Sequence, residues 1–445
     1  MAHKKHSKLV TALVLGLSSG YASAAGFQLL EQNVSGLGNA YAGSAAVAEN
    51  ASTIFFNPAG MTQLKDREFS AGVAAIGPSF KFSDNGSSVG GATGFGNAGN
   101  GGDAGSWAAV PNAYMSWALN KDLYVGVGLS APFGLKTEYS SPWIGSAQSN
   151  SFSVETMNIN PSIAYRVSDT VSLGAGVSWQ HIDAKYKRLA GAVDIPVPSI
   201  PITFPQALTT VSTVTATLKG DAWGWNVGGL FTASPATKVG VSYRSTVTQD
   251  VTGDIAVTGA SASPLAPTFY SLGTSGAKAS LKLPDMAILS ATHQLNDKWQ
   301  LLGDVSWTGW SSVPKLDLVR TSGVQNGAIA QTLDTDFRDT WRVAVGGTYQ
   351  YRQDLKLKFG LAYDQTPVKG EATRMVSLPD SDRTQISTGA QWALSGGSTL
   401  DLGLAYLMFA DASINNNQLL KARGLVKGNY TGSAWLLGLQ YSVPF

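Results

Sequence analysis

From about residue 68 to the C-terminus, apolar side chains alternate with small or polar ones. In the run 171–180 every odd position is apolar and every even position is Ser, Gly or Gln, and the runs 355–363 and 400–408 alternate in the same way. Alternation over about ten residues is typical of a membrane β-barrel, whose strands turn one face to lipid and the other to the lumen. A soluble β-sandwich also alternates, but its strands are usually shorter.

The composition favours the membrane alternative. Only 13% of the 445 residues are charged, while 44% are apolar. A soluble chain with so few charges would expose much apolar surface to water, so a lipid boundary is expected. No run of about 18 uninterrupted apolar residues follows residue 24, which excludes transmembrane helices.

Residues 1–24 are predicted to be a secretory signal peptide. Lys4, Lys5 and Lys8 precede an apolar core at 9–17, and the small residues at 22–24 form a cleavage site. Of the 31 Lys and Arg, 28 then remain against 29 Asp and Glu, so no basic excess argues for nucleic acid. The absence of Cys fits passage through an oxidising periplasm.

Connection lengths predict the number of strands. Short turns are expected at 120–122, 168–169, 234–236, 296–297, 352–354 and 395–397, and longer links near 84–106, 137–152, 190–207, 259–276, 321–330, 373–381 and 412–423. Six turns and seven links join fourteen strands. We therefore predict an all-β membrane protein, a 14-stranded antiparallel transmembrane β-barrel over residues 68–445.

The last strand supports this interpretation. Apolar residues alternate from Trp435 to the terminal Phe445. This is the pattern that outer-membrane barrels present to the barrel assembly machinery, which we expect as a partner.

The N-terminal segment 25–67 differs from the rest. It is dense in Gly and Ala and follows neither a two-residue nor a 3.6-residue period. A small, close-packing segment ahead of a long series of strands predicts a hatch, or plug, that lies inside the barrel.

Two of the long links, 190–207 and 261–272, are apolar, although outer loops normally face water. Either they pack on each other as a lid, or they expose a groove for an apolar ligand. The candidate groove residues are Ile195, Val197, Ile202, Phe204, Leu265, Phe269 and Tyr270.

Several motifs together resemble the FadL/TodX-type transporters of long-chain fatty acids and hydrocarbons in the Gram-negative outer membrane. In order, they are AGFQL at 25–29, SGLG at 35–38, NPA at 57–59, ETMN at 155–158, LPDM at 283–286, PDSDR at 379–383 and the terminal strand. No single motif is specific, but the ordered set covers the chain from 25 to 445.

The resemblance implies a transport route. The ligand would bind first in a groove between outer loops, pass to a luminal pocket, and leave sideways where a strand kinks. The kink would correspond to Ala131, Pro132, Phe133 and Gly134, and Pro132 has no N–H to give a neighbouring strand. The hatch residues implied in gating are Phe27, Asn57, Pro58 and Ala59.

Strand alternation assigns the polar candidates to a face. Arg188 falls on the luminal face and matches an arginine that the family associates with the ligand head group. Asp364 and Arg383 also fall on the luminal face, and we predict that they form one polar network with Asn57. Leu333 stands where well-studied members have a lysine, which leaves room for a neutral hydrocarbon as ligand.

The expected function is passive transport of long-chain fatty acids or similar hydrophobic molecules across the outer membrane. Neutral or aromatic hydrocarbons and a water-filled porin are the alternatives. An enzyme is not expected, because the only histidines after the signal, His181 and His293, lie in no nucleophile–base setting. We expect no cofactor and no metal, a monomer, and contact with outer-membrane lipid.

Overall fold

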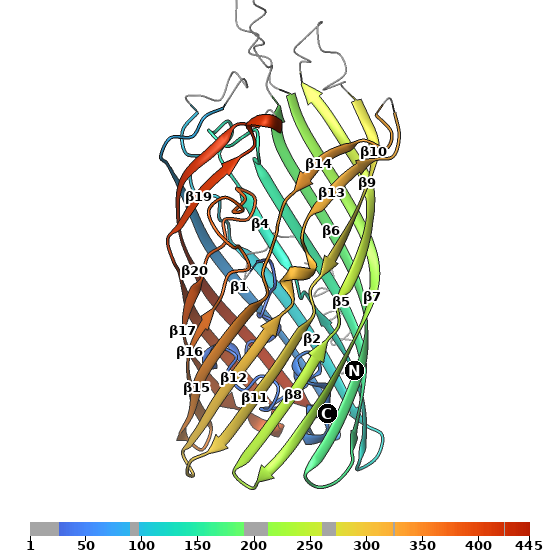
Figure 1. Cartoon of the computed structure of the whole chain (residues 1–445). Coiled ribbons are helices and arrows are strands. Elements are labelled where there is room, and N and C mark those ends of the chain that lie inside the picture. Colours follow the sequence, from blue (N-terminus) through green and yellow to red (C-terminus); the bar gives the residue numbers. More distant parts are fainter. Residues whose placement is uncertain (1–25, 90–97, 191–211, 260–272, 324, 422) are drawn as a thin grey trace, which may run out of the picture.

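A closed antiparallel sheet forms the wall of the molecule (Figure 1). The computed structural model describes residues 26–89, 98–190, 212–259, 273–323, 325–421 and 423–445. The sheet closes because the first strand, β1, pairs with the last, β20, from Glu68 opposite Pro444 to Asp84 opposite Gly428.

The elements have the following bounds. The strands are β1 (Arg67–Asp84), β2 (Ala108–Ala118), β3 (Leu123–Ser130), β4 (Gly134–Glu138), β5 (Ser151–Arg166), β6 (Val171–Ala190), β7 (Ser212–Ser234), β8 (Thr237–Arg244), β9 (Val247–Gly259), β10 (Gly273–Leu283), β11 (Met286–Gln294), β12 (Trp299–Thr308), β13 (Leu316–Arg320), β14 (Ile329–Leu333), β15 (Thr340–Arg352), β16 (Leu355–Asp364), β17 (Arg383–Ala393), β18 (Thr399–Phe409), β19 (Ala412–Asn417) and β20 (Leu425–Pro444). The helices are η1 (Leu37–Asn39), α2 (Thr53–Phe56), η2 (Pro58–Gln63), η3 (Trp310–Ser312), η4 (Ser395–Gly397) and η5 (Leu419–Lys421).

Fourteen spans make up the wall, as predicted. Six spans consist of two strands in series, namely β3–β4, β8–β9, β10–β11, β12–β13, β14–β15 and β18–β19, and eight consist of one strand. The six short turns also lie where the sequence placed them, between β2 and β3, β5 and β6, β7 and β8, β11 and β12, β15 and β16, and β17 and β18. Among the described helices, none has the length and hydropathy to cross a membrane.

The two faces of the wall follow the predicted alternation. On β6, Leu173 and Val177 are 50% and 51% exposed on the outer face, whereas Ser178 and Gln180 are both 2% exposed on the inner face. The outer face thus carries the apolar side chains that lipid covers.

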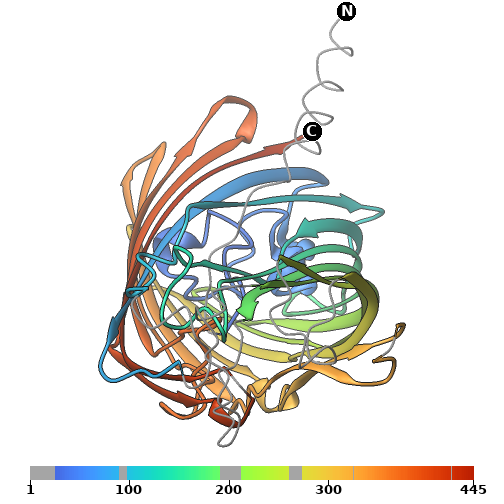
Figure 2. The same cartoon turned by 90° about the horizontal axis from the view of Figure 1, so that it is seen from above.

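The hatch, of which the structure describes residues 26–66, lies inside this wall. Seen from above, its blue chain occupies the space within the ring of strands (Figure 2). It carries η1, α2 and η2, and most of its side chains are buried. Wall glycines allow its backbone to approach closely. A Cβ added to Gly360 would lie 2.1 Å from the carbonyl carbon of Asn39, and one added to Gly240 would lie 2.0 Å from the Ala45 oxygen.

A methyl group at position 360 tests this close approach. Gly360→Ala is expected to lower the free energy of unfolding by about 1–3 kcal/mol, because the hatch backbone has no room to move away. The matched control is Gly303→Ala on β12, where the added Cβ meets nothing within 4 Å. Urea unfolding of both variants in lipid measures the difference. An equal stability of the two variants would contradict the close packing of hatch and wall.

Candidate functional site

An apolar cavity lies within the barrel, between the hatch and the inner faces of several strands. All of its lining residues except Thr335 are apolar. They are Phe27, Phe152, Val154, Ile182, Ala184, Leu218, Val251, Leu281, Val313, Leu316, Leu333, Thr335, Phe337, Met375 and Leu378. The hatch contributes Phe27, whose ring packs against Trp310 and Phe133 at centroid distances of 4.8 and 5.8 Å.

The prediction of small or polar residues along the luminal face is wrong for the part of the lumen that holds the cavity, where the inward residues are apolar. On β6 the inward positions change from Ser178 and Gln180 to Ile182 and Ala184. On β7, Leu218 likewise lines the cavity. The signal was present in the sequence as an inversion of the alternation: from about residue 181 the odd, outward residues of β6 become polar, as His181 and Asp183, while the even, inward residues become apolar.

A gap in the wall lies beside this cavity. β3 pairs with both β2 and β5, but its ladder with β2 ends at Leu129, while Ser130 still pairs with β5. The chain resumes at Gly134 as β4, which pairs with β5. Within the described residues no ladder joins β4 to β2. The interruption lies at 131–133, where the sequence analysis placed the kink, and Gly134 already belongs to β4.

The tip of the hatch pairs with the strand that borders this gap. Gln28 and Phe133 form an antiparallel bridge. On either side of it, the Gly134 N–H donates to the Phe27 carbonyl at 2.8 Å and the Leu29 N–H donates to the Pro132 carbonyl at 2.8 Å. The hatch therefore supplies, from inside, part of the backbone pairing that β2 does not give.

The NPA motif at 57–59 fixes the hatch to a different part of the wall. Asn57 is fully buried, and its side-chain amide donates to the carbonyls of Ala45 at 2.7 Å and Gly229 at 2.9 Å. Its side-chain oxygen accepts from the Ala59 N–H at 3.1 Å, and Pro58 begins η2. Asn57 thus ties two hatch segments to β7.

The predicted network of Asn57, Asp364 and Arg383 is wrong in one member. Arg383 donates to Asp364 at 2.8 Å, but the hydrogen bonds of the Asn57 side chain go to other residues. The ion pair reaches the hatch through Asp380, which lies 3.6 Å from Arg383 and accepts from the Gly26 N–H at 3.0 Å. Strand alternation gave the correct face for both wall residues, but it says nothing about which hatch segment lies opposite them.

A second buried ion cluster, which was not predicted from the sequence, joins hatch and wall. Lys358 on β16 is 2% exposed, and its ammonium group lies 2.7 Å from Glu49 of the hatch and 3.3 Å from Asp401 of β18. It also donates to the Ser35 carbonyl at 2.9 Å. The luminal face of Lys358 was visible in the sequence, but its partners come from segments far apart in the chain.

Arg188 lies on the same inner face of β6 as the cavity residues Ile182 and Ala184, and is 5% exposed. Because a strand rises by about 3.3 Å per residue, it lies roughly 13 Å beyond Ala184. Arg188 and Arg423 are both close enough to the Tyr186 hydroxyl to interact with it electrostatically, and Arg320 is similarly close to Arg188. Three arginines thus gather beyond one end of the cavity.

The predicted groove residues all lie outside the described residues. They are Ile195, Val197, Ile202, Phe204, Leu265, Phe269 and Tyr270. The signal peptide also lies outside them.

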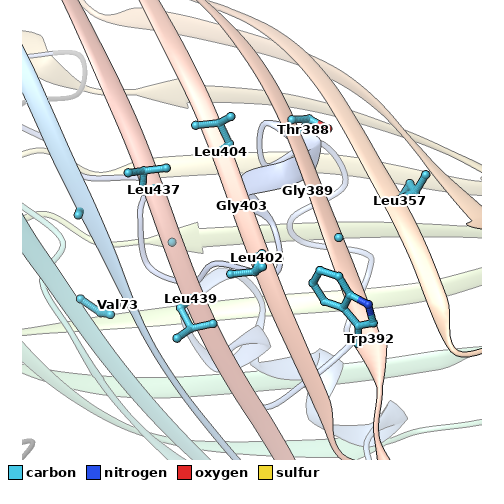
Figure 3. Close-up of a pocket in the computed structure, with 13 residues that line it drawn as sticks. Val73, Leu357, Thr388, Gly389, Trp392, Leu402, Gly403, Leu404, Leu437 and Leu439 are labelled. Carbon is cyan, nitrogen blue, oxygen red and sulfur yellow. The ribbon is translucent and has the colours of Figure 1, made fainter.

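A further apolar hollow, lined by Leu402, Leu404, Leu437 and Leu439 among others, is on the outer face of the wall (Figure 3). Those side chains point away from the lumen, so this hollow belongs to the lipid-facing surface.

Comparison with known proteins identifies the family. Residues 15–445 match the family model described as "Outer membrane protein transport protein (OMPP1/FadL/TodX)". The chain belongs to this family. A long-chain fatty acid transport protein of Escherichia coli O6:H1 is 30% identical over 462 residues, which cover 99% of this chain and 98% of that protein. Outer membrane protein P1 of Haemophilus influenzae is 32% identical over 428 residues, covering 91% and 90%.

Solved structures agree on the fold of this FadL-family barrel. A Pseudomonas aeruginosa FadL homologue superposes with a TM-score of 0.84 at 23% identity, covering 94% of this chain and 99% of that one. The Ralstonia pickettii toluene transporter TbuX gives 0.64 at 18% identity, covering 94% and 100%. The resemblance stated from the motifs is confirmed, and the protein is a multi-strand barrel of the outer membrane.

The Lys358 cluster predicts a strong dependence of hatch anchoring on one side chain. Lys358→Met leaves Glu49 and Asp401 without their cation, and breaking a buried pair in this way costs about 3–5 kcal/mol. Thermal unfolding in lipid should detect the loss. Lys298→Met removes an exposed lysine from a turn and is expected to stay within about 0.5 kcal/mol of wild type. A Lys358→Met barrel as stable as Lys298→Met would show that the cluster does not anchor the hatch.

Proposed function

We propose that this barrel transports long-chain fatty acids by passive diffusion. The observation that carries the proposal is the apolar cavity, which has the hatch residue Phe27 in its lining and the strand interruption at 131–133 beside it. Long-chain fatty acid transport proteins are among the relatives that match nearly the whole chain. In the proposed route, outer loops capture the ligand, the cavity holds its chain, and the ligand leaves sideways through the gap.

The cavity suits the tail of such a ligand. Burial of each CH₂ is worth about 0.8 kcal/mol, so a sixteen-carbon chain gains on the order of 12 kcal/mol before the entropy cost of binding. Capture is therefore favourable, and release is the demanding step. Movement of Phe27 would supply release, because it removes an aromatic face from the cavity lining.

The arginines near Arg188 suit the head group. A carboxylate placed there could accept charge-assisted hydrogen bonds, which are stronger than neutral ones. Leu333 lines the cavity itself, so an apolar side chain occupies the position where the family resemblance implies a lysine. In this proposal the cationic contact lies beyond the end of the cavity, and the tail takes the place next to Leu333.

The proposed exit is the gap between β2 and β4. Phe133 borders the gap and also packs against Phe27, so the tip of the hatch and the kinked strand are coupled directly. A displacement of residues 26–29 would break the pairing with 132–134 and open a path from the cavity to the outer face of the wall.

Neutral or aromatic hydrocarbons are the second candidate, and Leu333 is the observation that favours them. The toluene transporter TbuX shares the fold. Mass spectrometry of lipids that copurify with the barrel separates the two candidates. Fatty acid enriched over a mock barrel supports the first, and neutral hydrocarbon in its place supports the second.

Arg188 provides a test of head-group recognition. Arg188→Leu should weaken binding of palmitate by about ten- to a hundredfold, because one or more charge-assisted hydrogen bonds are lost. Binding of hexadecanol, which has the same chain and no charge, should change little. Lys187→Leu, on the opposite face of the same strand, is the matched control. Calorimetry on the purified barrel measures all three. Equal losses for acid and alcohol would exclude Arg188 as the head-group contact.

Gly134 provides a test of the exit. Gly134→Arg places a long charged side chain at the gap and is expected to reduce fatty acid uptake by cells at least tenfold, while palmitate binding to the purified barrel is kept. Gly134→Ala is the conservative control. Wild-type uptake by a correctly folded Gly134→Arg barrel would mean that the ligand leaves by another route.

A further inference from the structure

Ala131 lies two residues beyond the end of the ladder between β2 and β3, and in a continued strand its backbone groups would face β2. The hairpin between β2 and β3 shows which residues face which neighbour. The Leu119 N–H donates to the Leu123 carbonyl across this hairpin, whereas the Ala118 N–H donates to the Asp66 carbonyl on the side of β1. Odd residues of β2 therefore point their backbone groups toward β3. Since Ala113 pairs with Leu129, the next facing pair would be residue 111 with Ala131.

β2 cannot complete that pair, because residue 111 is proline. Pro111 has no N–H, so it has nothing to donate to the Ala131 carbonyl. In a membrane, an unpaired backbone N–H or C=O costs several kcal/mol, so another group has to take its place. Two prolines, Pro111 and Pro132, thus stand on the two sides of the gap.

The side chain of Gln32 in the hatch fills this position. Its Nε2 donates to the Ala131 carbonyl at 2.8 Å, and its Oε1 accepts from the Ala131 N–H at 3.2 Å. An amide has one donor end and one acceptor end, so it pairs with a peptide group as a neighbouring strand would. Gln32 is fully buried, and its Nε2 also donates to the Leu29 carbonyl at 2.9 Å.

The main chain of Gln32 is bound to the other side of the gap. The Tyr114 hydroxyl on β2 donates to the Gln32 carbonyl at 2.7 Å, and Tyr114 is 2% exposed. One residue therefore holds β2 through its carbonyl, the kinked segment through its side chain, and the hatch tip through Leu29.

We propose that Gln32 is the latch of the lateral gap, a positioning residue that keeps the kinked strand and the hatch tip in the closed arrangement. The proposal rests on the proposed lateral exit for its role in transport, while its geometry is independent of the ligand. Opening the gap then requires the Gln32 amide to leave Ala131, and the strength of these hydrogen bonds sets how often this happens.

Gln32→Leu and Tyr114→Phe each remove one half of the latch. Hydrogen exchange on the purified, folded barrel reads the result at the amides of Leu29, Ala131 and Gly134. Loss of the two bonds to Ala131 is expected to speed exchange at these amides by on the order of tenfold in Gln32→Leu. Tyr114→Phe should give a smaller increase at the same amides.

Thr62→Val is the matched control. Thr62 is a buried hatch residue that donates to Ser172 of the wall at 2.7 Å, away from the gap. Its isosteric replacement removes one hatch–wall hydrogen bond and should leave exchange at Leu29, Ala131 and Gly134 as in wild type. If Gln32→Leu and Tyr114→Phe also exchange as in wild type at these amides, the latch is excluded.

Measurement of fatty acid uptake distinguishes a latch from a residue that only stabilises the fold. With the latch removed, fatty acid uptake should rise at least twofold while the dissociation constant for palmitate stays the same, because release is eased and the cavity is unchanged. Reduced uptake together with a lowered unfolding temperature would reduce Gln32 to a structural residue and overturn the proposal. Faster hydrogen exchange with unchanged fatty acid uptake would show that the latch has no role in transport. If Gly134→Arg also left uptake unchanged, the lateral exit itself would fail.

Discussion

A strand in a membrane cannot leave its backbone polar groups unpaired, and the organisation of this barrel follows from that requirement. Most neighbouring spans satisfy it by pairing with each other, but the span β3–β4 loses its partner β2 beyond Leu129. There the main chain of the hatch tip supplies backbone hydrogen bonds to β3–β4 through Phe27 and Leu29. The plug and the wall are therefore not separate parts, since the wall at this place is completed by the plug.

The contacts of the hatch divide it into two regions. Its body is held by buried charges at Lys358, by Asn57 on β7 and by glycines that admit its backbone closely. At the gap its tip is held by neutral hydrogen bonds and by the ring of Phe27, and the Gly26 N–H adds one bond to the carboxylate of Asp380. Neutral hydrogen bonds contribute less than a buried ion cluster whose partner is removed. We expect the tip to move at a lower cost than the body, which suits a small gate on a fixed plug.

Much of the fold could be predicted from the sequence, because local patterns determine it. Alternation gave the strands and the face of Arg188, and short polar turns gave the number of spans. Pro132 marked the interruption of the strand. The partners of Asn57 and Lys358 could not be predicted, since they depend on which hatch segment meets which strand. Pro111 was readable in the sequence, but its significance appears only once the register places it opposite Ala131.

The central claim is that the hatch tip closes the lateral gap and must leave it before the ligand can. A cysteine pair tests this directly, because the chain has no other cysteine. Gln28 and Phe133 face each other in an antiparallel bridge, at a Cα separation that a disulfide can span. In the double variant Gln28→Cys and Phe133→Cys, oxidation should abolish fatty acid uptake, and reduction of the same cells should restore it. Equal uptake by the oxidised and the reduced protein would contradict the account.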